Sequence, residues 1–239
     1  MKHEQIKHDI NKDGYHVILD FISSEQVAEM RKLCDELPPH RGIVHGWTPS
    51  QAMYANDGLP WLYYYTPYIR ENKTINYIKE KLWPICTELL GPCTFRATDF
   101  IVNCARSYRQ KELIYRPHVD TPYRFEKFKD RTDLIGMQIA IVIDELTEEN
   151  GATGYIPGSH TLKYELMDHG KSTNHEKYVN FFLSNCKQHI AKPGTLILWD
   201  GRLLHSTMPN KTNTNRRLFL INAISKSICD ELDILDPIN

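Results

Sequence analysis

The sequence predicts a mainly β fold in which two antiparallel sheets form the core and helices flank them. From about residue 93 onward, short apolar and β-branched segments follow one another. Turn dipeptides separate these segments, namely Asn150-Gly151, Pro157-Gly158, Pro193-Gly194 and Asp200-Gly201. Before residue 93, apolar residues instead recur at helical spacing. Many short strands joined by Gly and Pro turns are typical of a sandwich or jelly roll.

The expected N-terminal elements follow from apolar spacing and from capping and breaking residues. Ser23 or Ser24 can cap the first helix, and Pro38-Pro39 ends it. Pro84 lies inside the second helix, where a kink or an early break is expected. The expected elements are a strand at 15–19, a helix at 24–37, an irregular aromatic segment at 40–70 and a helix at 73–90.

The rest of the chain is expected to form the sheets. One helix, at about 175–184, interrupts the series of strands. Strands are expected at 94–105, 113–115, 134–143, 152–156, 195–199 and 217–224. No linker or repeat divides the chain, so we expect one domain over 1–239, with a helical part at 1–92, a sheet core at 93–225 and a solvated acidic tail at 226–239.

Composition and charge exclude several classes of protein. The 239 residues are 41% hydrophobic and 25% charged, with a formal net charge of -1. This is a globular composition, unlike that of a disordered chain, a fibre or a coiled coil. A charge near zero provides no basic field for nucleic acid or an anionic membrane. The apolar runs are also far shorter than the roughly twenty residues of a membrane span. We therefore expect neither nucleic acid nor a membrane as a partner.

The six cysteines and the polar start of the chain suggest a compartment. No Cys-x-x-Cys pair is present, and the opening Met-Lys-His-Glu-Gln is not followed by an apolar stretch. A chain of this length does not need disulfides to fold, so we expect reduced and mostly buried thiols. The expected location is cytoplasmic. The sequence gives no sign of the oligomeric state.

A metal site is the best-supported chemistry in the sequence. Glycine-rich nucleotide loops and the Gly-x-Ser-x-Gly elbow are missing. His118 and Asp120 are two residues apart, so on an extended chain their side chains face the same way. Non-haem Fe(II) oxygenases use two His and one carboxylate and leave the remaining iron positions open. His205, after a buried strand and a turn, is the candidate for the second His.

An arginine eleven residues later fits the same chemistry. Arg216 begins a strand, and its guanidinium fork matches a carboxylate bidentately. It would suit the far carboxylate of a dicarboxylic co-substrate whose keto-acid end binds the iron. Arg217 is the alternative, because strand alternation lets only one of the two neighbours point inward.

Over most of its length the chain resembles the phytanoyl-CoA dioxygenase family of Fe(II)/2-oxoglutarate oxygenases. The segments that carry the resemblance are Gly14-Tyr15-His16-Val17-Ile18, His118-x-Asp120, Glu149-Asn150-Gly151, Pro157-Gly158-Ser159-His160 and His205-Ser206-Thr207-x-Pro209-Asn210 with Arg216. The resemblance implies a double-stranded β-helix (jelly roll, cupin-like). It also implies Fe(II), O2 and 2-oxoglutarate as cofactors, His118, Asp120 and His205 as metal ligands, Arg216 as the co-substrate arginine and Thr207 as a second co-substrate contact.

Two positions bear on how this chain differs within the family. Family members often have a Trp on the central strand where this chain has Ala140, which implies a differently shaped pocket. Halogenating relatives replace the metal carboxylate with Gly or Ala to admit chloride. Because Asp120 is retained, hydroxylation is the expected outcome.

Other polar residues are weaker candidates. Asn103, Tyr115 and Gln138 lie on strands that should line the cavity and could contact co-substrate or substrate, but buried polar side chains also serve structure. His160 sits in a turn, where a structural hydrogen bond is the simpler role. Four arginines could pair with an anionic substrate, but a solvated surface charge is the simpler role for each; they are Arg106, Arg109, Arg124 and Arg202. The aromatic segment 61–68 could form a wall of the substrate site or could equally pack between the helices and the sheet.

The expected function is hydroxylation of an unactivated C–H bond in a small soluble metabolite, such as an amino acid or a biosynthetic intermediate, with release of succinate and CO2. An acyl-CoA hydroxylase is the rival enzyme, disfavoured because no dense Lys/Arg cluster is present for the CoA phosphates. A non-catalytic jelly-roll protein that binds a metal or ligand is the rival outside the enzymes, since the fold alone hosts many functions.

Overall fold

The computed structural model describes residues 2–36, 52–54, 60–65, 72–103, 105, 117–162 and 175–235. The helices are α1 (Lys2–Asp13), α2 (Ser24–Glu36), α3 (Lys73–Leu90), α4 (His175–Asn185), α5 (Lys226–Leu235) and the 3-10 turn η2 (Ser159–Thr161). The strands are β1 (Tyr15–Ile18), β2 (Ala52–Tyr54), β3 (Pro60–Tyr65), β4 (Cys93–Asn103), β5 (Gly136–Val142), β6 (Thr153–Tyr155), β7 (Lys187–Gln188), β8 (Leu196–Asp200), β9 (His205–Thr207) and β10 (Arg216–Ser225).

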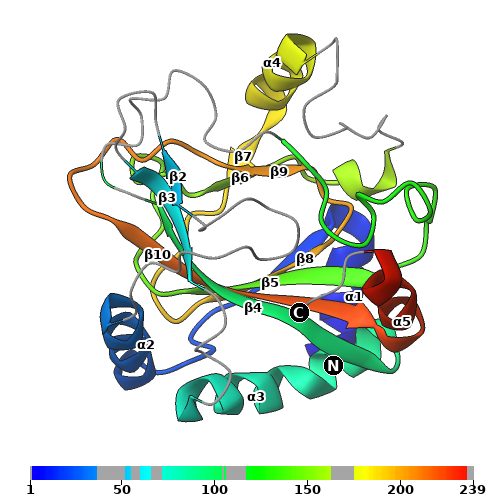
Figure 1. Cartoon of the computed structure of the whole chain (residues 1–239), viewed down its shortest axis with the longest axis horizontal. Helices are drawn as coiled ribbons and strands as arrows, with labels where there is room; N and C mark the ends of the chain where they lie inside the picture. The colour runs from blue at the N-terminus through cyan, green and yellow to red at the C-terminus, as the bar shows by residue number, and fades with distance from the viewer. Residues whose placement is uncertain are drawn as a thin grey trace.

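Two antiparallel sheets form the core. Within the described ranges the larger sheet has seven strands in the order β1-β8-β5-β10-β4-β3-β2, and the smaller has three in the order β7-β6-β9. Every neighbouring pair is antiparallel. In Figure 1 the smaller sheet lies above the larger sheet, and α2 and α3 lie below the larger sheet. This arrangement is a double-stranded β-helix, so the predicted fold class is confirmed.

Alternation along the strands sorts side chains between two cores. On β10, Phe219 and Ile221 point to the outer face and pack in one apolar cluster with residues of α2 and α3. Leu218 and Leu220 point to the inner face, toward the smaller sheet, and pack with Ala140 of β5. The space between the sheets is therefore lined by the second cluster, and this space receives the site described below.

The predicted helices α2, α3 and α4 are present with bounds close to those expected. Ser23 and Gln26 form a reciprocal capping box at the start of α2, at 3.0 and 3.3 Å, as the sequence suggested for this end. Pro84 lies inside α3 without ending it.

Four parts of the sequence prediction need correction. Helix α1 was not expected, because only Ile6 and Ile10 face the core and their spacing is a weak signal. The segment expected to be irregular contains β2 and β3, whose aromatic run lacks alternation. The short strands β7 and β9 were also missed. The expected solvated tail is instead helix α5, in which Ile228 and Leu232 are buried. The strand expected at 113–115 lies outside the described residues.

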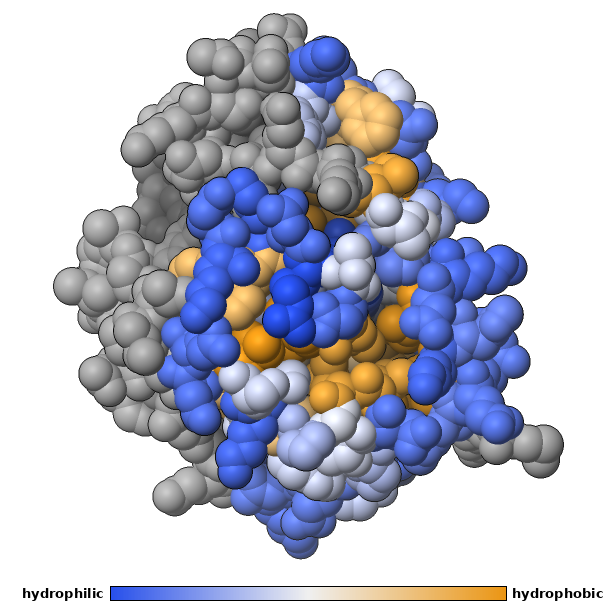
Figure 2. All heavy atoms as spheres, turned by 90° about the vertical axis from the view of Figure 1, so that its right-hand side faces the viewer, coloured by the Kyte–Doolittle hydropathy of each residue, from blue (hydrophilic) through white to orange (hydrophobic). Residues whose placement is uncertain are grey.

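One face of the molecule has a mostly polar surface. Figure 2 shows the face on the right-hand side of Figure 1, where hydrophilic side chains surround a central group of apolar ones. In the described part of the chain, no helix has the length and apolarity needed to cross a membrane.

Candidate metal centre

Backbone hydrogen bonds bring the three predicted metal ligands together. His118 and His205 form an antiparallel bridge in which each N–H donates to the carbonyl of the other, at 3.0 and 3.1 Å. The N–H of Asp120 donates to the carbonyl of Gly201 at 2.7 Å. Main-chain hydrogen bonds thus hold the segment that carries His118 and Asp120 against the β8–β9 connection and β9.

The side chains of these residues converge. His118 Nε2 lies 3.8 Å from Asp120 Oδ1, and His205 Nε2 lies 3.5 Å from Asp120 Oδ2. One ligand atom from each of the three residues lies within 4.8 Å of the other two. Two imidazole nitrogens and one carboxylate oxygen match the donor set of a non-haem Fe(II) site. The residues present therefore fit the metal that the sequence implies.

Hydrogen bonds from the ligands orient them. His205 Nδ1 lies 2.9 Å from the carbonyl of Leu203, which can only accept, so Nδ1 carries the proton and Nε2 is left as the ligand nitrogen. The indole N–H of Trp199 donates to Asp120 Oδ2 at 3.1 Å. The sequence reading missed both partners. The Leu203 carbonyl is part of the backbone, so no residue type marks it in the sequence. The sequence pattern indicates only a strand position for Trp199.

The turn between β8 and β9 is fixed by a buried ion pair. Asp200 is 1% exposed and accepts from Arg202 through both carboxylate oxygens, at 3.0 and 2.6 Å. Burial tends to lower the pKa of Arg202, but hydrogen bonds from its guanidinium to Asp200 leave that pKa above its ordinary value. Arg202 also donates to the carbonyl of Thr132. Arg202 thus has a structural role here, and its turn carries the Gly201 carbonyl that holds Asp120.

Arg216 and Arg217 point to opposite faces of β10. Arg216 is 1% exposed, lies on the inner face of β10, and donates through Nη2 to the carbonyl of Gly151 at 2.6 Å. Arg217 points to the outer face and forms ion pairs with Asp35 and Asp144, at 2.6 and 2.8 Å. The inward position that the co-substrate arginine requires therefore belongs to Arg216.

Asn103 lies beside Arg216 in the space between the two sheets, and Thr207 precedes Met208, whose carbonyl Asn103 contacts. Asn103 pairs with Arg216 across β4 and β10, and its amide donates to the carbonyls of Gly151 and Met208, at 3.3 and 2.9 Å. Thr207 is half-buried on β9, two residues after His205 and opposite Thr153. The structure thus brings Arg216 and Asn103 to one carbonyl.

Gln138 lies at the other end, beside the metal ligands. It stands opposite Trp199 on β8 and Asn222 on β10, so the three residues form a row across the inner face. Asn222 donates to Gln138 Oε1 at 3.2 Å and to the carbonyl of Thr121 at 3.5 Å, next to Asp120. Ala140 follows Gln138 on the same face.

The remaining candidates contribute less. His160 is buried, and its Nε2 donates to the carbonyl of Asn11 at 3.1 Å, which is the structural role expected of it. Arg124 lies over the ring of Phe125. Three further candidates lie outside the described residues; they are Tyr115, Arg106 and Arg109.

A buried histidine stands near the site without having been predicted. His189 is 5% exposed and stacks on Tyr155, with ring centroids 3.7 Å apart. Its ring also lies 6.3 Å from that of Trp199. Burial, with a smaller contribution from His205, lowers the pKa of His189 to about 3, so the ring is neutral at physiological pH.

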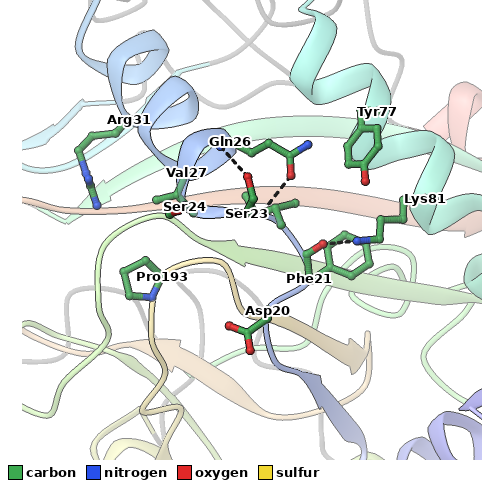
Figure 3. Close-up of a pocket in the computed structure, with 11 residues that line it drawn as sticks. Asp20, Phe21, Ser23, Ser24, Gln26, Val27, Arg31, Tyr77, Lys81 and Pro193 are labelled. Carbon is green, nitrogen blue, oxygen red and sulfur yellow. Dashed lines mark hydrogen bonds between the residues drawn. The ribbon is translucent and has the colours of Figure 1, made fainter.

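A cavity of about 730 Å³ lies elsewhere, at the start of α2. Figure 3 shows two sets of hydrogen bonds among its lining residues: Ser23 with Gln26, and Lys81 with the carbonyl of Phe21. None of the predicted site residues lines this cavity. It therefore belongs to the packing of helices on the outer face and not to the candidate metal centre.

Several solved structures share the fold of this chain. The chain superposes on EctD from S. alaskensis with a TM-score of 0.70 at 18% identity, covering 93% of this chain and 77% of that one. SnoK, a carbocyclase from nogalamycin biosynthesis, gives 0.70 at 16% identity, with 93% and 84% covered. HygX from Streptomyces hygroscopicus, with nickel, 2-oxoglutarate and hygromycin B bound, gives 0.68 at 13% identity, with 93% and 87% covered.

These likenesses show the shared fold. No curated protein matches the chain in sequence. The family model described as "Phytanoyl-CoA dioxygenase (PhyH)" matches residues 10–218, which is most of the chain. With this match, we conclude that the chain belongs to the phytanoyl-CoA dioxygenase family.

Proposed function

We propose that the chain is an Fe(II)- and 2-oxoglutarate-dependent dioxygenase that hydroxylates an unactivated C–H bond of a small metabolite and releases succinate and CO2. The observation that carries this proposal is the convergence of His118, Asp120 and His205, with ligand atoms within 4.8 Å of one another, in a member of an oxygenase family. When bound there, Fe(II) supplies the activation of O2 that C–H oxidation requires.

Each of these residues then has a defined task. His118, Asp120 and His205 hold the metal and leave its remaining positions to co-substrate and O2. Arg216 binds the far carboxylate of 2-oxoglutarate through its guanidinium fork. The inner-face side chains of Ala140, Leu218 and Leu220 are apolar, as the methylene groups of 2-oxoglutarate and a dry reaction space require.

The secondary contacts remain proposals. Thr207 lies on β9 two residues after His205, so its side chain faces the same side of the strand, and we propose its hydroxyl as a co-substrate contact. Tyr115, three residues before His118 in the sequence, is proposed as a further contact. Asn103 and Gln138 line the two ends of the same inner face, and each also supports nearby backbone or side chains. We propose that both shape the co-substrate space.

A small metabolite is the substrate class with the most support. Solved neighbours hold small polar molecules: a structure of EctD contains 2-oxoglutarate and 5-hydroxyectoine, and one of HygX contains hygromycin B. An acyl-CoA remains the alternative that the family name suggests, and the sequence offers no dense Lys/Arg cluster for its phosphates. Retention of Asp120 as a ligand favours hydroxylation over halogenation.

Other properties follow from the sequence and are proposed with the function. We propose a single domain without a nucleic-acid partner, in keeping with a net charge of -1. Among the described residues, five cysteines are free thiols and Cys34, Cys86 and Cys93 are buried. Reduced thiols support a cytoplasmic location.

The test of the proposed function is anaerobic addition of Fe(II) and 2-oxoglutarate to metal-free protein. The expected result is the weak visible charge-transfer band of the iron–keto-acid chelate in the wild type, and its loss in His205→Ala. Substrate screening by succinate release would follow. If the wild type gives no band at saturating components, the site is not a working oxygenase centre, and the non-catalytic jelly-roll protein becomes the better hypothesis.

A further inference from the structure

Trp199 stands in direct contact with the carboxylate of the candidate metal centre. It lies on the inner face of β8 and is 3% exposed. Its indole N–H donates to Asp120 Oδ2 at 3.1 Å, and its ring meets that of His205 edge to face at 5.3 Å. The same short segment, 199–201, also holds the Asp120 backbone through the carbonyl of Gly201. One segment thus fixes both the main chain and the side chain of this ligand.

The two carboxylate oxygens of Asp120 have different neighbours. Oδ2 receives the indole N–H and lies 3.5 Å from His205 Nε2, whereas Oδ1 lies 3.8 Å from His118 Nε2. An indole N–H can only donate, and a buried donor needs an acceptor. Asp120 Oδ2 meets this need for Trp199. A phenyl ring at position 199 would fill most of the same space and leave the carboxylate able to turn about its Cβ–Cγ bond.

From this asymmetry we propose that Trp199 is a positioning residue that keeps Asp120 a one-oxygen metal ligand. With Oδ2 held by the indole, Oδ1 would be the oxygen left to bind a metal. A carboxylate that bound through both oxygens would take up a coordination position that the co-substrate and O2 need. The proposal rests on the proposed function for the metal, but it concerns a contact between two side chains of the protein itself.

The first experiment therefore uses metal-free protein. The four tryptophans give four indole N–H signals in a ¹⁵N–¹H correlation spectrum. The Trp199 signal, identified through its contacts with the His205 ring, is expected to exchange with solvent far more slowly than that of Trp83, which is 45% exposed. Asp120→Ala is expected to shift the Trp199 signal and speed its exchange. A Trp199 signal that Asp120→Ala leaves unchanged would overturn the proposal even if no Trp199 variant folds.

The second experiment measures Co(II) binding by Trp199→Phe, with Trp83→Phe as the matched control. Trp83 packs edge to face on Phe95, on α3 and away from the ligands, so its substitution tests the loss of an indole in general. Loss of an outer hydrogen bond to a metal ligand typically weakens binding by about 10- to 100-fold. We expect a loss of this size for Trp199→Phe and none for Trp83→Phe. The visible Co(II) bands should also change in Trp199→Phe, because the carboxylate can then bind through both oxygens.

The outcomes separate the two proposals. If the wild type takes up no Co(II), the metal assignment fails whatever Trp199 does. If the wild type binds one Co(II) and Trp199→Phe binds it with the same affinity and the same visible spectrum, then the metal assignment stands and the role of Trp199 is refuted. A purely structural role for Trp199 would lower the unfolding temperature of Trp199→Phe without altering the Co(II) bands.

Discussion

Two adjacent arginines show how one residue step in a strand separates the proposed binding role of Arg216 from the structural role of Arg217. Arg216 faces the inner space, and Arg217 joins β10 to Asp35 of α2 and to Asp144. Both residues carry the same side chain, so the face of the strand decides what each can do.

We predict that Arg216→Lys raises the 2-oxoglutarate concentration needed for the chelate band by about 10- to 100-fold. Lysine keeps the charge but loses the planar fork, and a hydrogen bond to a charged group contributes about 1.5–3 kcal/mol. Arg217→Lys should leave this concentration unchanged and only lower stability. Titration of the band in both variants checks the prediction, and a rise confined to Arg217→Lys would show that the assignment of the two arginines is reversed.

At the level of single residues, the sequence could supply the three candidate metal ligands and the candidate co-substrate arginine, Arg216, because motif order and strand alternation are visible in it. The partners that orient those ligands were beyond its reach. The Leu203 carbonyl is backbone, and the Trp199–Asp120 bond joins residues 79 positions apart. The Trp199–Asp120 pair depends on where the 117–122 segment lies against the end of β8, and no local sequence pattern encodes that position.

Among the secondary-structure elements, those with strong periodicity were predictable and those with few core residues were not. Helices α2 and α3 carry several buried residues at helical spacing and clear caps. Helices α1 and α5 are rich in charge, and each buries only a pair of apolar side chains in the described structure. In α5 these are Ile228 and Leu232, which lie four residues apart and pack against Tyr123 and Phe128. Acidic residues of α5 made this segment look like a solvated tail.

We predict that Leu232→Ala lowers the free energy of unfolding by about 2–5 kcal/mol. Leu232 is fully buried in a cluster that supports the segment following Asp120, and truncation there leaves a cavity. Asp230→Ala, at an exposed position of the same helix, should change it by no more than about 0.5 kcal/mol. Urea unfolding of both variants is the measurement. Equal midpoints would mean that α5 contributes nothing to the folded state.

At the scale of the whole molecule, the site depends on the meeting of distant segments. His118 and Asp120 come from the segment before β5, His205 from β9 of the smaller sheet and Arg216 from β10 of the larger sheet. The bridge between His118 and His205 joins the first of these segments to the smaller sheet. Composition and periodicity gave the fold class, but this convergence was predictable only through the order of motifs shared with a family.

Buried aromatic residues between the sheets also make the stability of the whole fold depend on pH. His189 stacks on Tyr155, and burial lowers its pKa to about 3 in the folded protein, against 6.5 for an ordinary histidine. Above pH 6.5 the ring is neutral in both states. Between pH 6.5 and 3 the unfolded chain binds a proton that the folded protein refuses, so stability falls as the pH falls.

We therefore predict that His189→Phe, which keeps an aromatic ring against Tyr155, flattens the acid side of the stability curve. One proton taken up only on unfolding changes the free energy of unfolding by about 1.4 kcal/mol per pH unit. Between pH 6 and pH 4, the wild type should lose up to this amount per unit more than His189→Phe does. Urea unfolding of both proteins without metal, at half-unit steps, measures the two slopes. Parallel curves would show that His189 becomes protonated within the folded protein, and hence that its ring is not held neutral by burial between the sheets.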